Sequence, residues 1–386
     1  MPTISLIRCP SYDEAQVETA MRRAIDGIGG MARYVQPGQR VLLKVNLLRA
    51  AAPDAAITTH PAVVKALVRL VQEAGGRPVI GDSPGGPFVR PWVGAVYRAC
   101  GMTRVAEETG AELNWDFGET RLAHPTGHLI KSLEVGTFVT GADVVINVPK
   151  LKTHNFMHFT GATKNLFGVI PGTIKVGYHS KLPGREAFAD MLIDILTLIR
   201  PALTVMDGII AMDGAGPSAG DPFHVGALLA GPDGIALDVV AASLVGLDVR
   251  HIYPLQAAIR RGLTTGNPAD IDLVGDAPAD FVIKGFRPPE TGRIEGRGPI
   301  WLRRLVNRAF VPAPVATERC IACGVCVRNC PVEAITLAHV RAQNGEMVKR
   351  AVMNLDTCIR CYCCHELCPE RAIILTKSWV GKLGIR

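Results

Sequence analysis

Two copies of one cysteine pattern near the end of the chain constrain its fold more than any other feature. The first copy, "CIACGVCVRNCP", spans residues 320–331, and the second, "CIRCYCCHELCP", spans residues 358–369. Each copy places four cysteines at the same spacing and follows the last one with a proline. The similarity continues into "CPVEAITL" and "CPERAIIL". We interpret this repeat as an internal duplication.

The spacing is typical of domains that bind two iron–sulfur clusters. Three cysteines separated by two residues each can ligate one 4Fe-4S cluster, and the fourth cysteine ligates the cluster of the other repeat. We therefore predict two 4Fe-4S clusters with ligands crossed between the repeats. One predicted set is Cys320, Cys323, Cys326 and Cys368, and the other is Cys358, Cys361, Cys364 and Cys330.

Zinc and disulfides explain the same cysteines less well. Zinc ribbons generally use paired CxxC knuckles, not four cysteines closed by a proline. A disulfide framework suits a small secreted domain, whereas Cys9 and Cys100 are the only cysteines before residue 320. We interpret those two as buried apolar residues and Cys363, which falls outside the repeated pattern, as a bystander thiol.

Length and composition leave room for a second, larger domain. A chain of 386 residues is long for a ferredoxin and suits one large domain plus one small one. The chain has no apolar run of about eighteen residues and no signal-peptide pattern at its start, so we expect no transmembrane segment. Exposed low-potential clusters also need reducing conditions, which leads us to expect a cytoplasmic protein of anaerobic surroundings.

Segment 281–316 is predicted to be a basic linker rich in proline, glycine and arginine. Within it, "IWLRRLVNRAF" places apolar residues on one face of a helix and arginines on the other. This amphipathic helix either packs on the large domain or contacts a membrane surface or a protein partner. A nucleic-acid partner is not expected, because the basic stretch has no recognisable binding motif and aromatic residues are only 5% of the chain.

Residues 1–280 alternate short aliphatic runs with helical patterns. This alternation predicts an α/β domain with a mostly parallel sheet covered by helices. The predicted strands are 40–48, 77–86, 142–150, 202–209 and 225–234, and the predicted helices are 61–76, 185–201 and 235–246. From about residue 317 we predict a small ferredoxin-like α+β domain, with a hairpin at Asn344-Gly345 between the two cysteine motifs.

Polar residues follow several predicted strands, where open parallel sheets bind their ligands. The densest group begins at residue 150, and Gly168 and Gly172 beside it would allow close approach of the backbone to a ligand. Three interpretations remain open for this segment. It binds an anionic substrate, with His154 as a proton donor near neutral pH; it is a docking patch for an acidic redox partner; or it is a solvated loop.

Several stretches resemble bacterial and archaeal proteins that join domain-of-unknown-function family 362 to a two-cluster ferredoxin domain. They are "KVNLL", "TTHPAVVKALVRLVQEAGG", "GDSPGG", "NVPKLKTHNFMHFTGATKNLFG" and "CIRCYCCHELCP". The resemblance spans essentially the whole chain and implies electron transfer, but it implies no established reaction for the large domain. It also singles out five side chains. The expected catalytic residues are Lys150, Lys152 and His154, and the expected substrate-binding residues are Lys164 and Asn165.

The leading hypothesis is an iron–sulfur protein that delivers low-potential electrons to a small anionic substrate or to a redox partner bound by the α/β domain. The plainer alternative is a ferredoxin-type carrier whose large domain only selects partners. A third is a redox-sensing regulatory or assembly protein. An ordered pocket beside a cluster would favour the first, a reductase, and a flat surface would favour the carrier.

Overall fold

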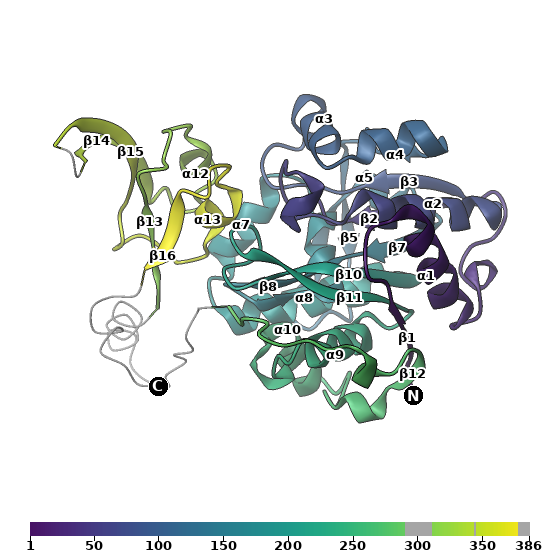
Figure 1. Cartoon of the computed structure of the whole chain (residues 1–386). Helices are drawn as coiled ribbons and strands as arrows, with labels where there is room; N and C mark the ends of the chain where they lie inside the picture. The colour runs from purple at the N-terminus through teal and green to yellow at the C-terminus, as the bar shows by residue number, and fades with distance from the viewer. Residues whose placement is uncertain (290–310, 343–344, 377–386) are drawn as a thin grey trace.

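A computed structural model describes residues 1–289, 311–342 and 345–376 of the chain. It divides them into a large α/β domain and a small cysteine-rich domain at one end of the molecule (Figure 1). The amphipathic helix predicted within residues 300–310 lies outside these residues, and so does Asn344 of the predicted turn. No helix in the described ranges is long and apolar enough to cross a membrane.

The large domain is built on a ten-stranded sheet. Eight of its strands follow one another in the order β12-β1-β11-β10-β7-β2-β3-β4, and β8 and β9 complete the sheet beside β10. Its strands are β1 (Thr3–Arg8), β2 (Arg40–Val45), β3 (Arg77–Gly81), β4 (Glu112–Leu113), β7 (Val144–Val148), β8 (Lys150–His154), β9 (His158–Thr160), β10 (Leu203–Asp213), β11 (Asp221–Gly231) and β12 (Asp272–Gly275). Six of the strand pairs are parallel and three are antiparallel. The predicted mostly parallel sheet is therefore confirmed.

Helices cover both faces of this sheet (Figure 1). They are α1 (Glu14–Asp26), α2 (Pro61–Glu73), α3 (Arg90–Ala99), α4 (Met102–Thr109), α5 (Thr137–Thr140), α6 (Ala162–Asn165), α7 (Ile174–Lys181), α8 (Arg185–Ile199), α9 (Gly234–Leu244) and α10 (Tyr253–Arg260). Successive strand residues point to opposite faces. Accordingly, Val41 and Leu43 of β2 belong to the core formed with α1 and α2, whereas Leu42 belongs to the core formed with α8 and α9.

Three further pairs of strands lie outside the main sheet. In the large domain, β5 (Glu119–Ala123) pairs with β6 (Ser132–Gly136). In the small domain, β13 (Ala313–Ala316) pairs with β16 (Ile373–Thr376), and β14 (Ile335–Arg341) forms an antiparallel hairpin with β15 (Met347–Met353). This hairpin lies between the two cysteine motifs, where the sequence predicts it.

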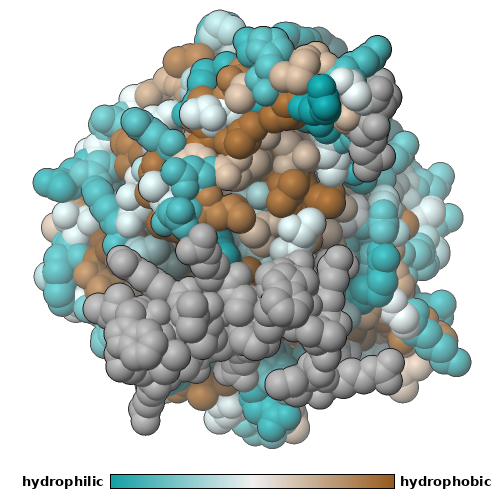
Figure 2. Space-filling view, turned by 90° about the vertical axis from the view of Figure 1, so that its left-hand side faces the viewer, coloured by the Kyte–Doolittle hydropathy of each residue, from teal (hydrophilic) through white to brown (hydrophobic). Residues whose placement is uncertain are grey.

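Each cysteine motif of the small domain contains one short helix. These are α12 (Val325–Arg328) in the first motif and α13 (Cys363–Leu367) in the second. Helix α13 lies on the side of the small domain that faces the large domain (Figure 1). Figure 2 looks onto the small-domain end of the molecule, where apolar side chains gather between polar ones.

Candidate functional site

A pocket lies where the carboxyl ends of β2 and β3 face helix α13 of the small domain. Its cavity volume is about 100 Å³, and its mouth is open to solvent. Residues of the large domain that line it include Asn46, Asp82, Ser83, Lys164, Asn165 and Lys175. The small domain contributes Cys363, Glu366 and Leu367. Both domains are therefore needed to form this pocket.

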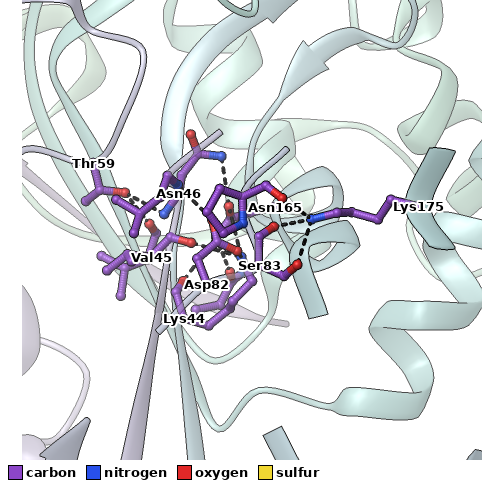
Figure 3. Close-up of polar contacts among 12 residues, drawn as sticks. Lys44, Val45, Asn46, Thr59, Asp82, Ser83, Asn165 and Lys175 are labelled. Carbon is purple, nitrogen blue, oxygen red and sulfur yellow. Dashed lines mark hydrogen bonds and ion pairs between the residues drawn. The ribbon is translucent and has the colours of Figure 1, made fainter. Parts of the chain in front are cut away.

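A buried ion pair forms the base of the pocket (Figure 3). The Nζ of Lys44, which is fully buried on β2, lies 2.8 Å from Oδ1 of Asp82, the residue that follows β3. The other carboxylate oxygen of Asp82 accepts a hydrogen bond of 2.7 Å from the backbone N–H of Leu47. Burial lowers the pKa of Lys44, and the charge of Asp82 acts against this effect. The pair adds no net charge to the pocket and ties the two strand ends together.

Gly168 packs directly against this ion pair. A Cβ atom at Gly168 would lie 2.3 Å from Oδ1 of Asp82 and 2.7 Å from Nζ of Lys44. No larger residue fits there without displacing the pair. The backbone at Gly168 therefore lies close to these two side chains, whereas the sequence led us to expect a close approach to a ligand.

Two asparagines stand beside the ion pair, and both line the pocket (Figure 3). The side-chain nitrogen of Asn46 donates to Oδ1 of Asn165 at 2.9 Å, and that of Asn165 donates to Oδ1 of Asn147 at 2.8 Å. Behind them, Nζ of Lys152 donates to Oδ1 of Asn46 at 2.8 Å. This network holds Asn165, a residue expected to bind substrate, in a fixed orientation at the pocket wall.

Two lysines give the pocket its positive charge. Lys175 reaches from α7 and donates hydrogen bonds to the backbone oxygen and the hydroxyl of Ser83 (Figure 3) and to the backbone oxygen of Pro84. Burial lowers the pKa of Lys175 to about 7. The ammonium of Lys164 lies 4.7 Å from the centre of the Phe167 ring and makes no hydrogen bond or ion pair with a described residue. Burial lowers the pKa of Lys164, and the charge of Glu366, which also lines the pocket, acts against this effect.

The remaining sequence-predicted residues lie behind the pocket, not in its wall. Lys150, Lys152 and His154 form most of strand β8 and are almost completely buried, so the interpretation of this part of the segment as a solvated loop is wrong. Lys150 is held by Asp207, at 2.9 Å, and by the hydroxyl of Tyr12, at 2.6 Å.

His154 differs most from its expected role. Its Nδ1 accepts hydrogen bonds from the backbone N–H groups of Phe156, at 3.0 Å, and Met157, at 3.3 Å. Burial, together with the charges of Lys164 and Lys152, lowers the pKa of His154 well below its ordinary value. The expectation of a proton donor that titrates near neutral pH is therefore not met at this position.

Helix α13 is anchored against the large domain at several points. The hydroxyl of Ser218 donates to the backbone oxygen of Glu366 at 2.8 Å, and Nε2 of His154 lies 3.5 Å from Oε1 of Glu366. Gly85 is so close to the helix that an added Cβ would lie 2.2 Å from Cδ2 of Leu367. Cys363, expected to be a bystander thiol, begins this helix and lines the pocket. These contacts bring the second cysteine motif to the pocket wall.

One of the two predicted cysteine sets lines a cavity of its own. This small cavity is lined by four cysteines, here called the outer set: Cys320, Cys323, Cys326 and Cys368. The other four are called the inner set: Cys330, Cys358, Cys361 and Cys364. Burial and the neighbouring thiols of the outer set raise the pKa of Cys326 to about 11. Four thiols around one cavity are the donor set that a 4Fe-4S cluster requires.

The internal duplication is also visible in the backbone. Three residues of the first repeat have a positive φ, and so do their counterparts in the second. The pairs are Ala322 and Arg360, Gly324 and Tyr362, and Glu333 and Arg371. In addition, the N–H groups of Ala334 and Ala372 donate to Sγ of Cys330 and Cys368, both at 3.2 Å. The two loops thus have the same conformation, which supports the predicted exchange of the fourth cysteine.

A buried aspartate of α9 positions the helix that carries Lys164 and Asn165. The carboxylate of Asp238 accepts hydrogen bonds from the N–H groups of Ala162, at 2.6 Å, and Thr163, at 2.9 Å, at the start of α6. Asp238 is the fifth residue of α9, and this contact explains why an aspartate is buried there. The sequence could not reveal a partner that lies about seventy residues away.

We expect Asp238→Ala to lower the free energy of unfolding by about 2–4 kcal/mol, because it leaves two buried N–H groups without acceptors. Urea denaturation of the wild type and the variant measures this difference. Asp238→Asn, which keeps one acceptor oxygen, should lose less. Equal stability of the alanine variant and the wild type would show that the contact does not position α6.

Comparisons with known proteins agree with this division of the chain. Residues 41–243 match the family described as a domain of unknown function, DUF362, and residues 319–372 match the 4Fe-4S dicluster domain. The thylakoid-associated protein sll1697 of Synechocystis sp. (strain ATCC 27184 / PCC 6803 / Kazusa) is 37% identical over 301 residues, which cover 75% of this chain and 88% of that protein.

Two solved structures are similar to part of the chain. The lactate racemase apoprotein from Thermoanaerobacterium thermosaccharolyticum aligns with a TM-score of 0.39 and 14% identity, over 64% of this chain and 57% of that one. A protein from Thermotoga maritima aligns with a TM-score of 0.32 and 15% identity, over 53% of this chain and 51% of that one. The chain thus spans little more than half of either structure, at scores too low to infer a shared fold.

Proposed function

Because this chain belongs to the DUF362 family and carries a C-terminal 4Fe-4S dicluster domain, we propose that it is a ferredoxin-linked reductase that delivers single electrons to a small anionic substrate. The observation that carries this proposal is the position of α13. The helix contains Cys364 of the inner set, and its residues Cys363, Glu366 and Leu367 form one wall of the pocket. A substrate in the pocket would therefore lie next to the inner set.

The outer and inner sets would each hold one 4Fe-4S cluster, which accepts and releases one electron at a time. The chain supplies the surroundings that tune this exchange. The N–H groups of Ala334 and Ala372 donate to sulfurs of Cys330 and Cys368, and hydrogen bonds to cluster sulfurs adjust the reduction potential.

The charge and hydrogen-bonding groups of the pocket support an anionic substrate. Lys164 presents its ammonium without a protein partner among the described residues, and Lys175 adds a second positive charge when protonated. The hydroxyl of Ser83 already accepts hydrogen bonds from Lys175 and from the N–H of Gly172, so its own proton is left to donate to a ligand. A carboxylate or phosphate would satisfy these groups together.

The two alternatives receive less support. A carrier whose large domain only selects partners needs a flat docking surface beside the inner set, whereas this part of the molecule contains a pocket lined by both domains. A redox-sensing regulatory role would need a switching element that responds to the clusters, and no contact of the described residues favours one.

Anaerobic purification of the whole chain tests the proposal. The reconstituted protein should contain about eight iron and eight sulfide per chain, and mass spectrometry of the protein-bound small molecules should identify an anion. Chemically reduced protein should then be reoxidised when this anion is added in excess, with formation of its reduced product. A protein that retains no anion, or whose reduced clusters are stable in its presence, would contradict the proposed reaction.

The affinity for the anion should decrease as the pH rises through about 7. Burial lowers the pKa of Lys175 to about 7, so its positive charge is present below this pH and lost above it. An anion favours the charged form, and each pH unit above the pKa should weaken binding by up to about tenfold. Titration calorimetry with the identified anion measures the effect. In Lys175→Met the affinity should be lower below pH 7 and its pH dependence much reduced, whereas an unchanged pH profile in this variant would assign the effect to another group.

A further inference from the structure

The two cysteine sets differ in their access to solvent. In the outer set, Cys323 is exposed, and the neighbouring Ile321 side chain is 65% exposed. Each set contains two buried cysteines, Cys326 and Cys368 at 8% in the outer set and Cys361 and Cys364 at 9% and 7% in the inner set. Of the eight cysteines, Cys323 alone is exposed. The inner set includes Cys364 on the helix at the pocket wall, whereas Cys323 of the outer set lies at the surface of the small domain. Protein partners can therefore approach the outer set more closely than the inner one.

The small domain exposes an unusual share of large apolar side chains. Eleven such side chains are exposed among the described residues of the whole chain, and six of them belong to this domain. The six are Val315, Ile321, Met347, Val352, Leu355 and Ile374. Figure 2, which looks onto this end of the molecule, shows apolar residues gathered between polar ones. Clusters of exposed apolar residues are typical of protein-binding surfaces.

Basic side chains surround the exposed cysteine. Arg319 and Arg328 are both exposed, and Arg328 lies over the loop of the outer set, because a Cβ at Gly324 would be 2.9 Å from its Nη1. The nearest acidic neighbour of Arg319 in the sequence, Glu318, is 3.5 Å from Arg350. Glu318 and Glu370 are also exposed here, and Glu370 lines the cavity of the outer set. Against Arg319, Arg328 and Arg350 they leave an excess of one positive charge beside an apolar residue, which complements an acidic protein.

We propose that this surface, formed by Arg319, Ile321 and Arg328 around Cys323, is the docking site of an acidic one-electron carrier protein. The carrier gives one electron to the cluster held by the outer set and is itself oxidised by one electron. The electron then passes to the inner set, beside the pocket. Binding of the carrier and reduction of this chain depend on this surface alone. Only the delivery of electrons to a substrate rests on the proposed reductase function.

Binding of an oxidised acidic bacterial two-cluster ferredoxin to the oxidised whole chain tests the proposal without any turnover. Titration calorimetry at low salt should detect a complex. Its affinity should fall as salt is added, because salt screens the attraction between the opposite charges of the two proteins. Ile321→Asp and Arg328→Glu should each raise the dissociation constant about tenfold. The matched control is Met347→Asp, which places the same charge on an equally exposed apolar position of the β14–β15 hairpin.

The rate of reduction supplies a second readout. With the reduced ferredoxin, Ile321→Asp and Arg328→Glu should slow the bleaching of the visible iron–sulfur absorbance about tenfold at low salt, and iron analysis should confirm that both variants hold all their iron. Lys181→Met, which removes an exposed charge of the large domain, should be reduced at the wild-type rate, whether or not the pocket binds an anion. If Met347→Asp instead weakens binding and the two variants at the outer set do not, the carrier docks on the hairpin and the proposal is wrong.

Discussion

Replacing Cys364 with alanine is expected to reduce the iron content of the reconstituted chain from about eight to about four per molecule and to abolish substrate reduction. A 4Fe-4S cluster needs four thiolate ligands, and Cys364 is the ligand of the inner set that lies on the helix at the pocket wall. Ligand retention in the pocket should survive, because Lys164 and Ser83 belong to the large domain. Iron and sulfide analysis and the spectra of the reduced protein measure the loss.

The adjacent thiol offers a matched control. Cys363→Ala changes the next residue of the same helix, and this variant should keep about eight iron atoms, because Cys363 is not part of either set. Loss of four iron atoms from Cys363→Ala, with retention in Cys364→Ala, would overturn the ligand assignment. A third variant tests the exchange between the repeats. If Cys330→Ala removed the cluster of the outer set, the predicted crossing would be wrong.

Lys164→Met should weaken anion binding about 10- to 100-fold, the effect of losing a hydrogen-bonded charge worth about 1.5–3 kcal/mol. Methionine keeps much of the length and the apolar stem over Phe167 but removes the only ammonium of the pocket that has no protein partner among the described residues. The cluster spectra should not change, since every predicted ligand lies at residue 320 or beyond. Mass spectrometry of the retained anion and its binding isotherm measure the effect.

A second lysine variant separates this loss from a general loss of positive charge. Lys181→Met removes an exposed charge at the end of α7 and should bind the anion like the wild type. Lys164→Arg should bind with intermediate affinity, because the charge remains while its donors change position. Wild-type affinity in Lys164→Met would rule out the pocket as the anion site, even if the cysteine assignment is correct.

The cysteine sets and the strand ends are the features that a sequence can predict, because both depend on local rules. Ligand spacing within each cysteine loop is set by the cluster that it must hold. Polar residues after parallel strands collect at one edge of the sheet, which led correctly to Lys164 and Asn165 as pocket residues. The same rule also selected Lys150 and His154, but the chain continues there as strand β8 and buries them.

The residues that were missed reach the pocket through long-range packing. Lys175 comes from α7, whose sequence has no strong apolar periodicity from which a helix could be predicted. Glu366 comes from the other domain. A sequence pattern contains no information on which face of a small domain packs against a large one. The direction of a strand is equally hidden, since the apolar run of β11 (Asp221–Gly231) would suit a parallel neighbour as well as the antiparallel ones it has.

The contact of Leu367 with Gly85 has a kinetic consequence. In the proposed reductase, α13 lines the pocket from a domain of the same polypeptide, so the last electron transfer would be unimolecular. Its rate would be independent of protein concentration, unlike that of a reaction between a separate ferredoxin and a separate enzyme. Dilution can slow only the first encounter with an external carrier. With one electron on each of the two proposed clusters, a single molecule would hold the two electrons that a two-electron reduction consumes. It could transfer both to the same bound substrate before it meets another protein.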